Sequence, residues 1–207
     1  MSLAPREQRL ARLFTFVVQG DWDHLRSERR AAPPGEPDRG WRECVLQAHV
    51  FAGFPRVVEA YDVLAACGGL GEIGSDEVLA EPDQRERGRA LFERIYEKDS
   101  ARVRERLRAG HPDFERWIEG HAYGRILSRP GLDPRMRELL AVAGLAALGQ
   151  DRQMASHARG ALRCGAHPSD VAAVLECVAE WIAPERLERA RAVTAHFTQG
   201  AGGPSGA

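Results

Sequence analysis

The chain has 207 residues, enough for one domain or a tightly fused pair of domains with a substantial apolar core. Its 29 basic and 30 acidic side chains nearly cancel, so the net charge favours neither a nucleic-acid partner nor an acidic membrane surface. No apolar stretch approaches the roughly 18 residues of a membrane span, and the arginine-rich N-terminus lacks the apolar segment of a signal peptide. We therefore expect a cytoplasmic protein with no membrane and no nucleic-acid partner.

The residue types predict an all-α chain, because Ala, Leu, Arg and Glu dominate and alternating β-branched runs are missing. Proline and glycine mark the breaks, in a loop at 33–38 and at Gly53-Phe54-Pro55. Asp21 and Asp133 are suited to cap the helices that follow them. Helices are expected at about 5–19, 22–31, 41–51, 56–66, 88–96, 101–109 and 113–127, with further helices starting near residues 134, 151, 168 and 184.

The two halves of the chain align without a gap at an offset of 129 residues. Break points coincide in this alignment, since Gly20 falls on Gly149 and Pro55 falls on Pro184. We therefore predict a duplicated multi-helix unit. Its parts are an N-terminal helical repeat at 1–67, a linker at 68–87, a C-terminal helical repeat at 88–200 and a disordered tail of small residues at 201–207.

The C-terminal repeat carries a candidate acid–base pair, Glu138 and His157. Glu138 lies in an otherwise strongly apolar helix, where an unpaired carboxylate is costly. His157 on the next helix is the obvious partner, and a desolvated glutamate beside a histidine can transfer protons near neutral pH. The alternative is that Glu138 faces water or pairs with Arg135 or Arg137. At the equivalent positions the first repeat has an arginine and a glutamate, which cannot do the same chemistry.

The spacing around this pair is distinctive: eleven residues separate Glu138 from Gln150, two separate Gln150 from Gln153, and three separate Gln153 from His157. It resembles the Glu-x11-Cys-x2-Cys-x3-His site of the alkylhydroperoxidase D branch of the carboxymuconolactone decarboxylase superfamily, with both cysteines replaced by glutamine. The sequence from 124 to 179 is similar as well. The resemblance implies an alkylhydroperoxidase D-like helical fold and a homo-oligomer. Because the thiols are absent, it points to the decarboxylase-like branch. The two glutamines either form hydrogen bonds in a pocket or simply start the helix.

The first repeat contains a second motif that resembles this superfamily, the segment 47–56, which includes Phe-Ala-Gly-Phe-Pro-Arg. His49 is a candidate second acid–base group, although a lone histidine on a largely apolar helix face is more often a satisfied core residue. Phe54 is expected to shape a pocket wall at the helix break. Arg56 and Arg159 are the candidates to hold a substrate carboxylate through two parallel hydrogen bonds.

Cysteine and histidine do not occur with the spacing of a metal site or a disulfide framework. Without a CxxC pair the cysteines are expected to be small buried hydrophobic residues. We therefore predict no metal and no cofactor. The cysteines are Cys44, Cys67, Cys164 and Cys177, and the histidines without ligand spacing are His24, His111, His121, His167 and His196.

Three functions follow from these patterns. The first is a decarboxylase-like enzyme that uses Glu138 and His157 on a small carboxylated lactone or keto acid. The second is a thiol peroxidase, which is disfavoured because it needs a reactive cysteine with a resolving partner. The third is a non-enzymatic helical oligomer or ligand-binding paralogue, which suits the loss of one motif from each repeat. Convergence of the pair and the segment 51–56 on one cavity would favour the enzyme.

Overall fold

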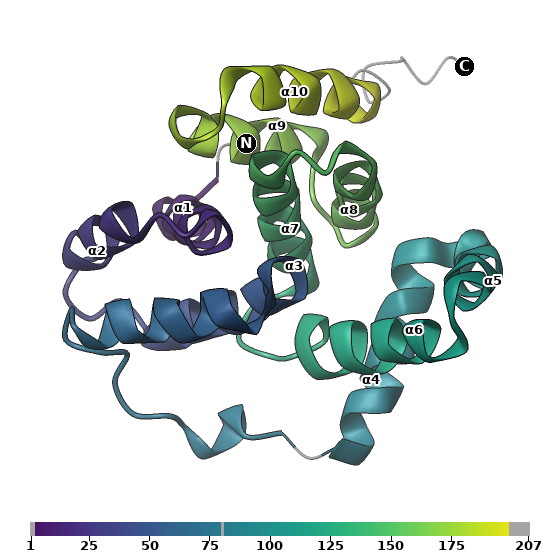
Figure 1. The fold of residues 1–207 in the computed structure, drawn as a ribbon, viewed down its shortest axis with the longest axis horizontal. Coiled ribbons are helices and arrows are strands. Elements are labelled where there is room, and N and C mark those ends of the chain that lie inside the picture. Colours follow the sequence, from purple (N-terminus) through teal and green to yellow (C-terminus); the bar gives the residue numbers. More distant parts are fainter. Residues whose placement is uncertain (1–2, 80, 199–207) are drawn as a thin grey trace, which may run out of the picture.

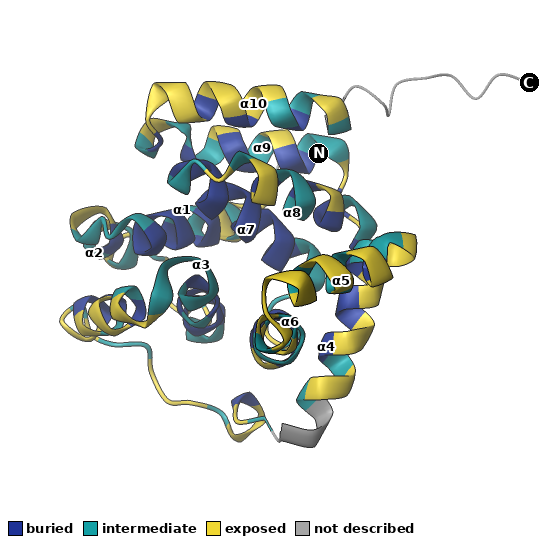
Figure 2. Ribbon diagram, turned by 45° about the vertical axis from the view of Figure 1, so that its right-hand side comes forward, coloured by how far each residue is buried: buried dark blue, intermediate teal, exposed yellow. Residues whose placement is uncertain are grey.

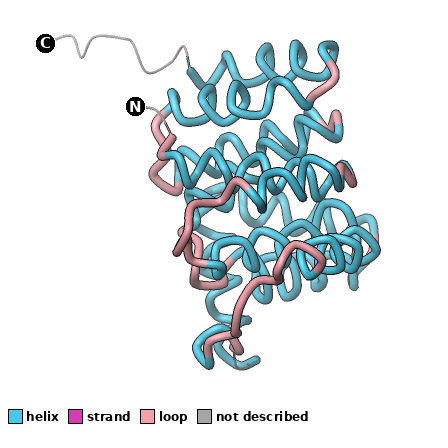
Figure 3. Tube along the Cα trace, turned by 90° about the vertical axis from the view of Figure 1, so that its left-hand side faces the viewer, coloured by secondary structure: helices cyan, strands magenta, loops and turns pink. Residues whose placement is uncertain are grey.

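The computed structural model describes residues 3–79 and 81–198, and within these ranges it contains helices and loops but no strand (Figure 3). The predicted all-α class is therefore confirmed. The predicted disordered tail at 201–207 lies outside the described residues. None of the described helices combines the length and the apolar character needed to cross a membrane.

The helices follow one another along the chain with short connections (Figure 1). The first part contains α1 (Pro5–Gln19), α2 (Trp22–Arg30), α3 (Asp38–Ala65) and the 3-10 turn η1 (Ser75–Glu77). The middle part contains α4 (Glu81–Tyr96), the 3-10 turn η2 (Glu97–Asp99), α5 (Ser100–Gly110), α6 (Pro112–Trp117) and the π-helix η3 (Ile118–Leu127). The last part contains α7 (Pro134–Leu148), α8 (Asp151–Arg163), α9 (Pro168–Val178), the 3-10 turn η4 (Ala179–Trp181) and α10 (Pro184–Thr198).

Helix α7 is the centre of the main bundle. Its side chains are buried without interruption from Met136 to Ala147, and Figure 2 shows it as buried along most of its length. A helix that is apolar on every side is stable only when other helices cover all of its faces. Accordingly α7 packs against α1, α8, α9, α10 and α3. Between Met136 and Ala147 a polar side chain therefore lies in the interior, and Glu138 is one of them.

The segment from α4 to η3 forms an arm beside the bundle, at the lower right of Figure 1. It has its own apolar cluster, which includes Phe92 and Tyr123. Helix α4 packs along η3, and the backbones touch where Gly88 meets Gly124: a Cβ on Gly88 would lie 2.5 Å from the Cα atom of Gly124. The arm also contacts the bundle through α4 and α8.

The helix boundaries occur at the offset predicted for the duplication. Helices α1 and α7 both start with proline, and their first and last residues lie 129 positions apart. Both end at a glycine in the left-handed conformation, Gly20 with φ 76° and Gly149 with φ 69°, which is the usual helix C-terminal signal. The duplication and its domain limits stay a prediction.

Several predicted helix limits differ from the structure. The two helices expected at 41–51 and 56–66 form one kinked helix, α3, because only Gly53 leaves the helical conformation, with φ 78° and ψ 167°. The helix expected at 113–127 is α6 followed by a π-helix of 10 residues. Helix α4 starts at Glu81, seven residues earlier than expected and inside the range predicted as a linker.

A buried ionic network fixes α7 against α3. The guanidinium of Arg137 is 1% exposed and lies 2.7 Å from a carboxylate oxygen of Glu43. Arg129 approaches the other oxygen of the same carboxylate at 2.8 Å. The side chain of Gln47 donates a hydrogen bond to the carbonyl of Arg137 at 2.8 Å. These contacts fix the N-terminal turns of α7, and therefore the position of Glu138.

Candidate active site

Glu138 and His157 meet in the structure, with Oε2 of Glu138 2.9 Å from Nδ1 of His157. The glutamate is 1% exposed. Neither neighbouring arginine is its partner, because Arg135 pairs with acidic residues elsewhere and Arg137 pairs with Glu43. The other carboxylate oxygen of Glu138, Oε1, is buried and has no hydrogen-bond partner among the described residues.

The helical hairpin of α7 and α8 explains how the two side chains meet. The turn at Gly149 returns the chain antiparallel, and α8 packs along α7. Gly160 on α8 faces the glutamate, since a Cβ at this position would lie only 2.3 Å from Oε2 of Glu138. Ile95 of the arm covers the same point. A glycine is therefore needed one turn after His157 to leave room for the carboxylate.

His157 lines a cavity of about 500 Å³ between the bundle and the arm. Most of its wall is apolar or aromatic, and the ring of Phe51 meets the His157 ring edge-on at 5.5 Å. Since Nδ1 of His157 is paired with Glu138, Nε2 is the ring nitrogen available to the cavity. The lining residues are Val50 and Phe51 of α3, Tyr96 of α4, Val103, Arg106, Leu107 and Gly110 of α5, Phe114 of α6, Ile118, Ala122, Tyr123 and Leu127 of η3, and Arg152, Gln153, Ser156 and His157 of α8.

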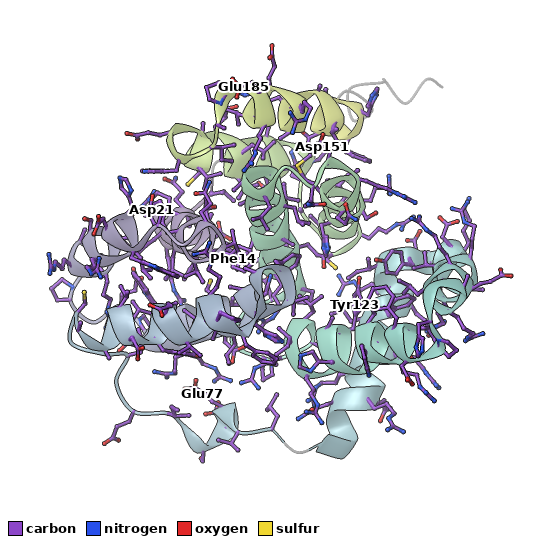
Figure 4. All side chains as sticks on the ribbon, viewed as in Figure 1. Phe14, Asp21, Glu77, Tyr123, Asp151 and Glu185 are labelled. Atoms are coloured by element: carbon purple, nitrogen blue, oxygen red, sulfur yellow. The ribbon has the colours of Figure 1, made fainter. Side chains whose placement is uncertain are left out.

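Two tyrosines from the arm lie in the same cavity. The hydroxyl of Tyr123 donates a hydrogen bond to the hydroxyl of Tyr96 at 3.0 Å. Figure 4 marks Tyr123 where the arm meets α7 and α8. Burial raises the pKa of both phenols, and the negative charge of Glu138 raises it further. Both tyrosines therefore stay neutral at physiological pH, and the proton of Tyr96 has no acceptor among the described residues.

Two exposed arginines stand at the rim of the cavity, Arg106 on α5 and Arg152 on α8. Neither has an ion-pair partner among the side chains that the structure describes. Arg159, the arginine predicted to hold a carboxylate, lies further along α8 in an adjoining groove and not in the cavity. Its guanidinium donates to the hydroxyl of Ser156 at 3.3 Å and lies 5.6 Å from the ring of Phe197.

The motif at 47–56 is divided by the kink at Gly53. Phe51, before the kink, reaches the cavity. Phe54 is exposed and faces a separate groove of about 880 Å³. Arg56 points the other way, with its guanidinium 5.8 Å from the ring of Trp22. The structure therefore places neither Phe54 nor Arg56 with Glu138 and His157.

His49 also lies outside the cavity. Its ring stacks on Phe54 at 5.0 Å, and its Nε2 lies 2.6 Å from Nε2 of His121. Burial lowers the pKa of His121, and the neighbouring His49 lowers it further. His121 lines the groove of Phe54, and Val50, which follows His49 in the sequence, lines the cavity.

The remaining candidates have simple roles. Gln153 lines the cavity, whereas Gln150 is the residue immediately before α8, at the N-cap position. Burial raises the pKa of the Cys164 thiol to about 11, which keeps it protonated and unreactive. Within the described residues no three His, Cys, Asp or Glu side chains are placed to hold a metal ion.

Comparisons with known proteins show one family model and two relatives that match parts of this chain. The sequence model of the carboxymuconolactone decarboxylase family matches residues 112–196. Peroxisomal protein 2 of Schizosaccharomyces pombe is 27% identical over 135 residues, which cover 63% of this chain and 62% of that protein. The 4-carboxymuconolactone decarboxylase of Acinetobacter baylyi is 36% identical over 69 residues, which cover 33% of this chain and 52% of that enzyme.

The chain thus spans between half and two thirds of the length of each relative. The family match begins after Tyr96 and Arg106, so these two cavity residues come from a part of the chain outside it. Glu138 and His157 lie within it. The segment 112–196 is therefore similar to the carboxymuconolactone decarboxylase family, the family that the spacing of its glutamate and histidine indicated.

Proposed function

We propose that this protein is an acid–base enzyme that decarboxylates a small carboxylated lactone or keto acid. The observation that supports this most is the contact of 2.9 Å between a buried Glu138 and His157 at the wall of a largely apolar cavity. The name of the bacterial relative, a 4-carboxymuconolactone decarboxylase, supports the same reaction class.

The proposed proton donor is His157. When the carbon–carbon bond to the carboxylate breaks, carbon dioxide leaves and its electron pair remains on the substrate as an enolate. Nε2 of His157 then gives a proton to the carbon, and the histidine recovers a proton from water. Glu138 fixes the ring through Nδ1 and stabilises the positive imidazolium before transfer. An apolar wall favours this step, because a carboxylate is poorly solvated there, and its localised charge becomes the delocalised charge of the enolate that His157 then neutralises by protonation.

The two tyrosines would stabilise the enolate by hydrogen bonding. A neutral phenol is a hydrogen-bond donor, and the unused proton of Tyr96 is available to the enolate oxygen. Tyr123 donates to Tyr96 and so polarises the second hydroxyl. The arginines at the rim, Arg106 and Arg152, would hold a further carboxylate of the substrate.

The proposal is tested by release of carbon dioxide from a panel of small lactone and keto acids. His157→Gln should lower turnover by about 10²- to 10⁴-fold, the usual contribution of a positioned acid or base. His49→Gln, in a histidine outside the cavity, is the control and should keep the wild-type rate. Equal turnover by wild type and His157→Gln would contradict the proposal.

The family resemblance also supports a homo-oligomer, which light scattering of the purified protein would establish. A cytoplasmic location stays a prediction from composition, and the name of the Schizosaccharomyces pombe relative describes that protein alone.

A further inference from the structure

A groove of about 440 Å³ continues from the cavity along the outside of α8. One side is formed by the end of α4 and by α5, and the other by α8. The groove and the cavity are in contact, because they share Tyr96, Val103, Arg106, Arg152 and Ser156 in their walls.

The groove is strongly basic. Five of its lining side chains are arginines and one, Asp99, is acidic, although the whole chain has a net charge of −1. The arginines come from two helices that face each other. Their spacing places each set on one helix face: Arg102 and Arg106 are one turn apart on α5, and Arg152, Arg159 and Arg163 follow one stripe of α8.

Only part of this positive charge is neutralised by the protein. Arg102 pairs with Asp99 at 2.8 Å, and Arg163 pairs with Glu97 at 3.1 Å. Among the described side chains no carboxylate pairs with the three other arginines of the groove, which are Arg106, Arg152 and Arg159. Like charges that face each other across a groove repel, and an anion between them would remove the repulsion.

We propose that the groove binds an oxyanion group of two or more negative charges on the substrate, either a phosphate or diphosphate ester or a pair of further carboxylates. That this anion is part of the substrate rests on the proposed function, whereas the binding of an anion does not. Guanidinium groups suit this ligand because they bind phosphate and carboxylate through two parallel hydrogen bonds. A single carboxylate at the rim would neutralise only part of the positive charge of Arg106, Arg152 and Arg159.

The geometry also gives the orientation of the substrate. Arg106 and Arg152 lie in both walls, so they mark the boundary between the two compartments. The reacting end would lie inside, near His157, and the charged end would lie outside, near Arg159. The substrate would then be larger than a simple lactone and would carry its charges at one end.

Titration calorimetry with inorganic pyrophosphate, and separately with citrate, tests the groove at constant ionic strength. The double variant Arg152→Gln/Arg159→Gln should bind the preferred anion at least about tenfold more weakly for each arginine removed. The matched control is Arg26→Gln/Arg108→Gln, which also removes two positive charges from the surface, one partly exposed and one exposed, but from outside the groove. Circular dichroism establishes that both variants are folded.

If pyrophosphate binds more tightly than citrate, and this affinity is lost in the groove variant and kept in the control, the anion is a phosphate group. If citrate binds more tightly than pyrophosphate, with the same loss in the groove variant, the anion is a pair of carboxylates. If neither anion binds, or if the control loses as much affinity as the groove variant, the proposal is wrong. His157→Gln should bind both anions like the wild type, so the failure of catalysis and the failure of this groove are distinguishable.

Discussion

Glu138 is a carboxylate placed where the chain is otherwise apolar, and its surroundings explain how it is tolerated. His157 satisfies one oxygen, and Gly160 leaves the space that the carboxylate fills. The pair was predictable from the sequence because its partners lie 19 residues apart on one helical hairpin. Tyr96 and Arg106 were not predictable, since they reach the cavity only through the packing of the arm against α8.

The two facing rows of arginines could not be predicted from either helix alone. Arg106 lies among regularly spaced arginines of α5, which are typical of a solvated helix face. A single helix cannot indicate that a second row, on α8, stands opposite. Arg56 was predicted to hold a substrate carboxylate because it ends the motif at 47–56, but beyond the kink at Gly53 it lies against Trp22.

Tyr96→Phe tests the role of the phenol pair. Loss of one donor to an enolate oxygen should lower kcat by about 100-fold or more and change KM little, because the contact strengthens as charge develops. Steady-state kinetics on the substrate found in the acid panel measures both constants. Tyr61→Phe, outside the cavity, should behave like the wild type. A change confined to KM would show that Tyr96 only contributes to binding.

Gly160→Ala tests the space around the carboxylate. Alanine is favoured over glycine inside a helix by about 1 kcal/mol, so stability should change little. The added methyl group would nevertheless displace Glu138 from His157 and lower turnover by about 100-fold, the effect of a displacement near 1 Å. The control is Gly120→Ala, where a Cβ meets no atom within 4 Å. Unchanged turnover of Gly160→Ala would show that the contact with His157 is not needed.

The helices themselves follow from local signals. Asp133 accepts a hydrogen bond from the backbone of Met136 and starts α7 where the sequence predicted, and glycine ends both α1 and α7. The π-helix η3 has no comparable signal, because its backbone is set by packing against α4 rather than by capping residues. This segment contributes to both hollows: Tyr123 on one face lines the cavity, and His121 on another face lines the groove of Phe54.

Arg137→Met tests the ionic network that joins α7 to α3. Removing one partner from a buried ion pair leaves an uncompensated charge and costs about 3–5 kcal/mol. Urea unfolding should therefore show a large loss of stability. Arg108→Gln, which removes an exposed ion pair with Glu115, should cost about 0–1 kcal/mol. Similar losses in the two variants would mean that the buried network contributes little.

Glu77 gives a pH dependence to the loop between α3 and α4. Hydrogen bonds from Arg42 lower the pKa of this carboxyl from 4.5 to about 2. A depressed pKa adds stability above pH 4.5, and this stability is lost as the pH falls toward 2. In scanning calorimetry the wild type should melt above Glu77→Gln at pH 7, and the difference should shrink below pH 4.5. A difference that is constant with pH would contradict this role.

The molecule as a whole combines a helical bundle with an arm, and the cavity lies between them. We propose that the bundle arose by duplication. At the positions of Glu138 and His157 the first half has Arg9 and Glu28, which form an ion pair of 3.1 Å. The same place in the two halves therefore holds a polar contact, but in the second half it is a glutamate–histidine pair beside the arm.

One NMR measurement on the free protein examines the proposed proton pathway without any substrate. In ¹⁵N-labelled wild type, the Nδ1 proton of His157 should give a resonance protected from exchange by its contact with the buried Glu138. This resonance should vanish in Glu138→Leu, which has no acceptor, and in His157→Gln, and it should persist in His49→Gln. A wild-type spectrum that Glu138→Leu leaves unchanged would mean that the two side chains do not form a pair in solution.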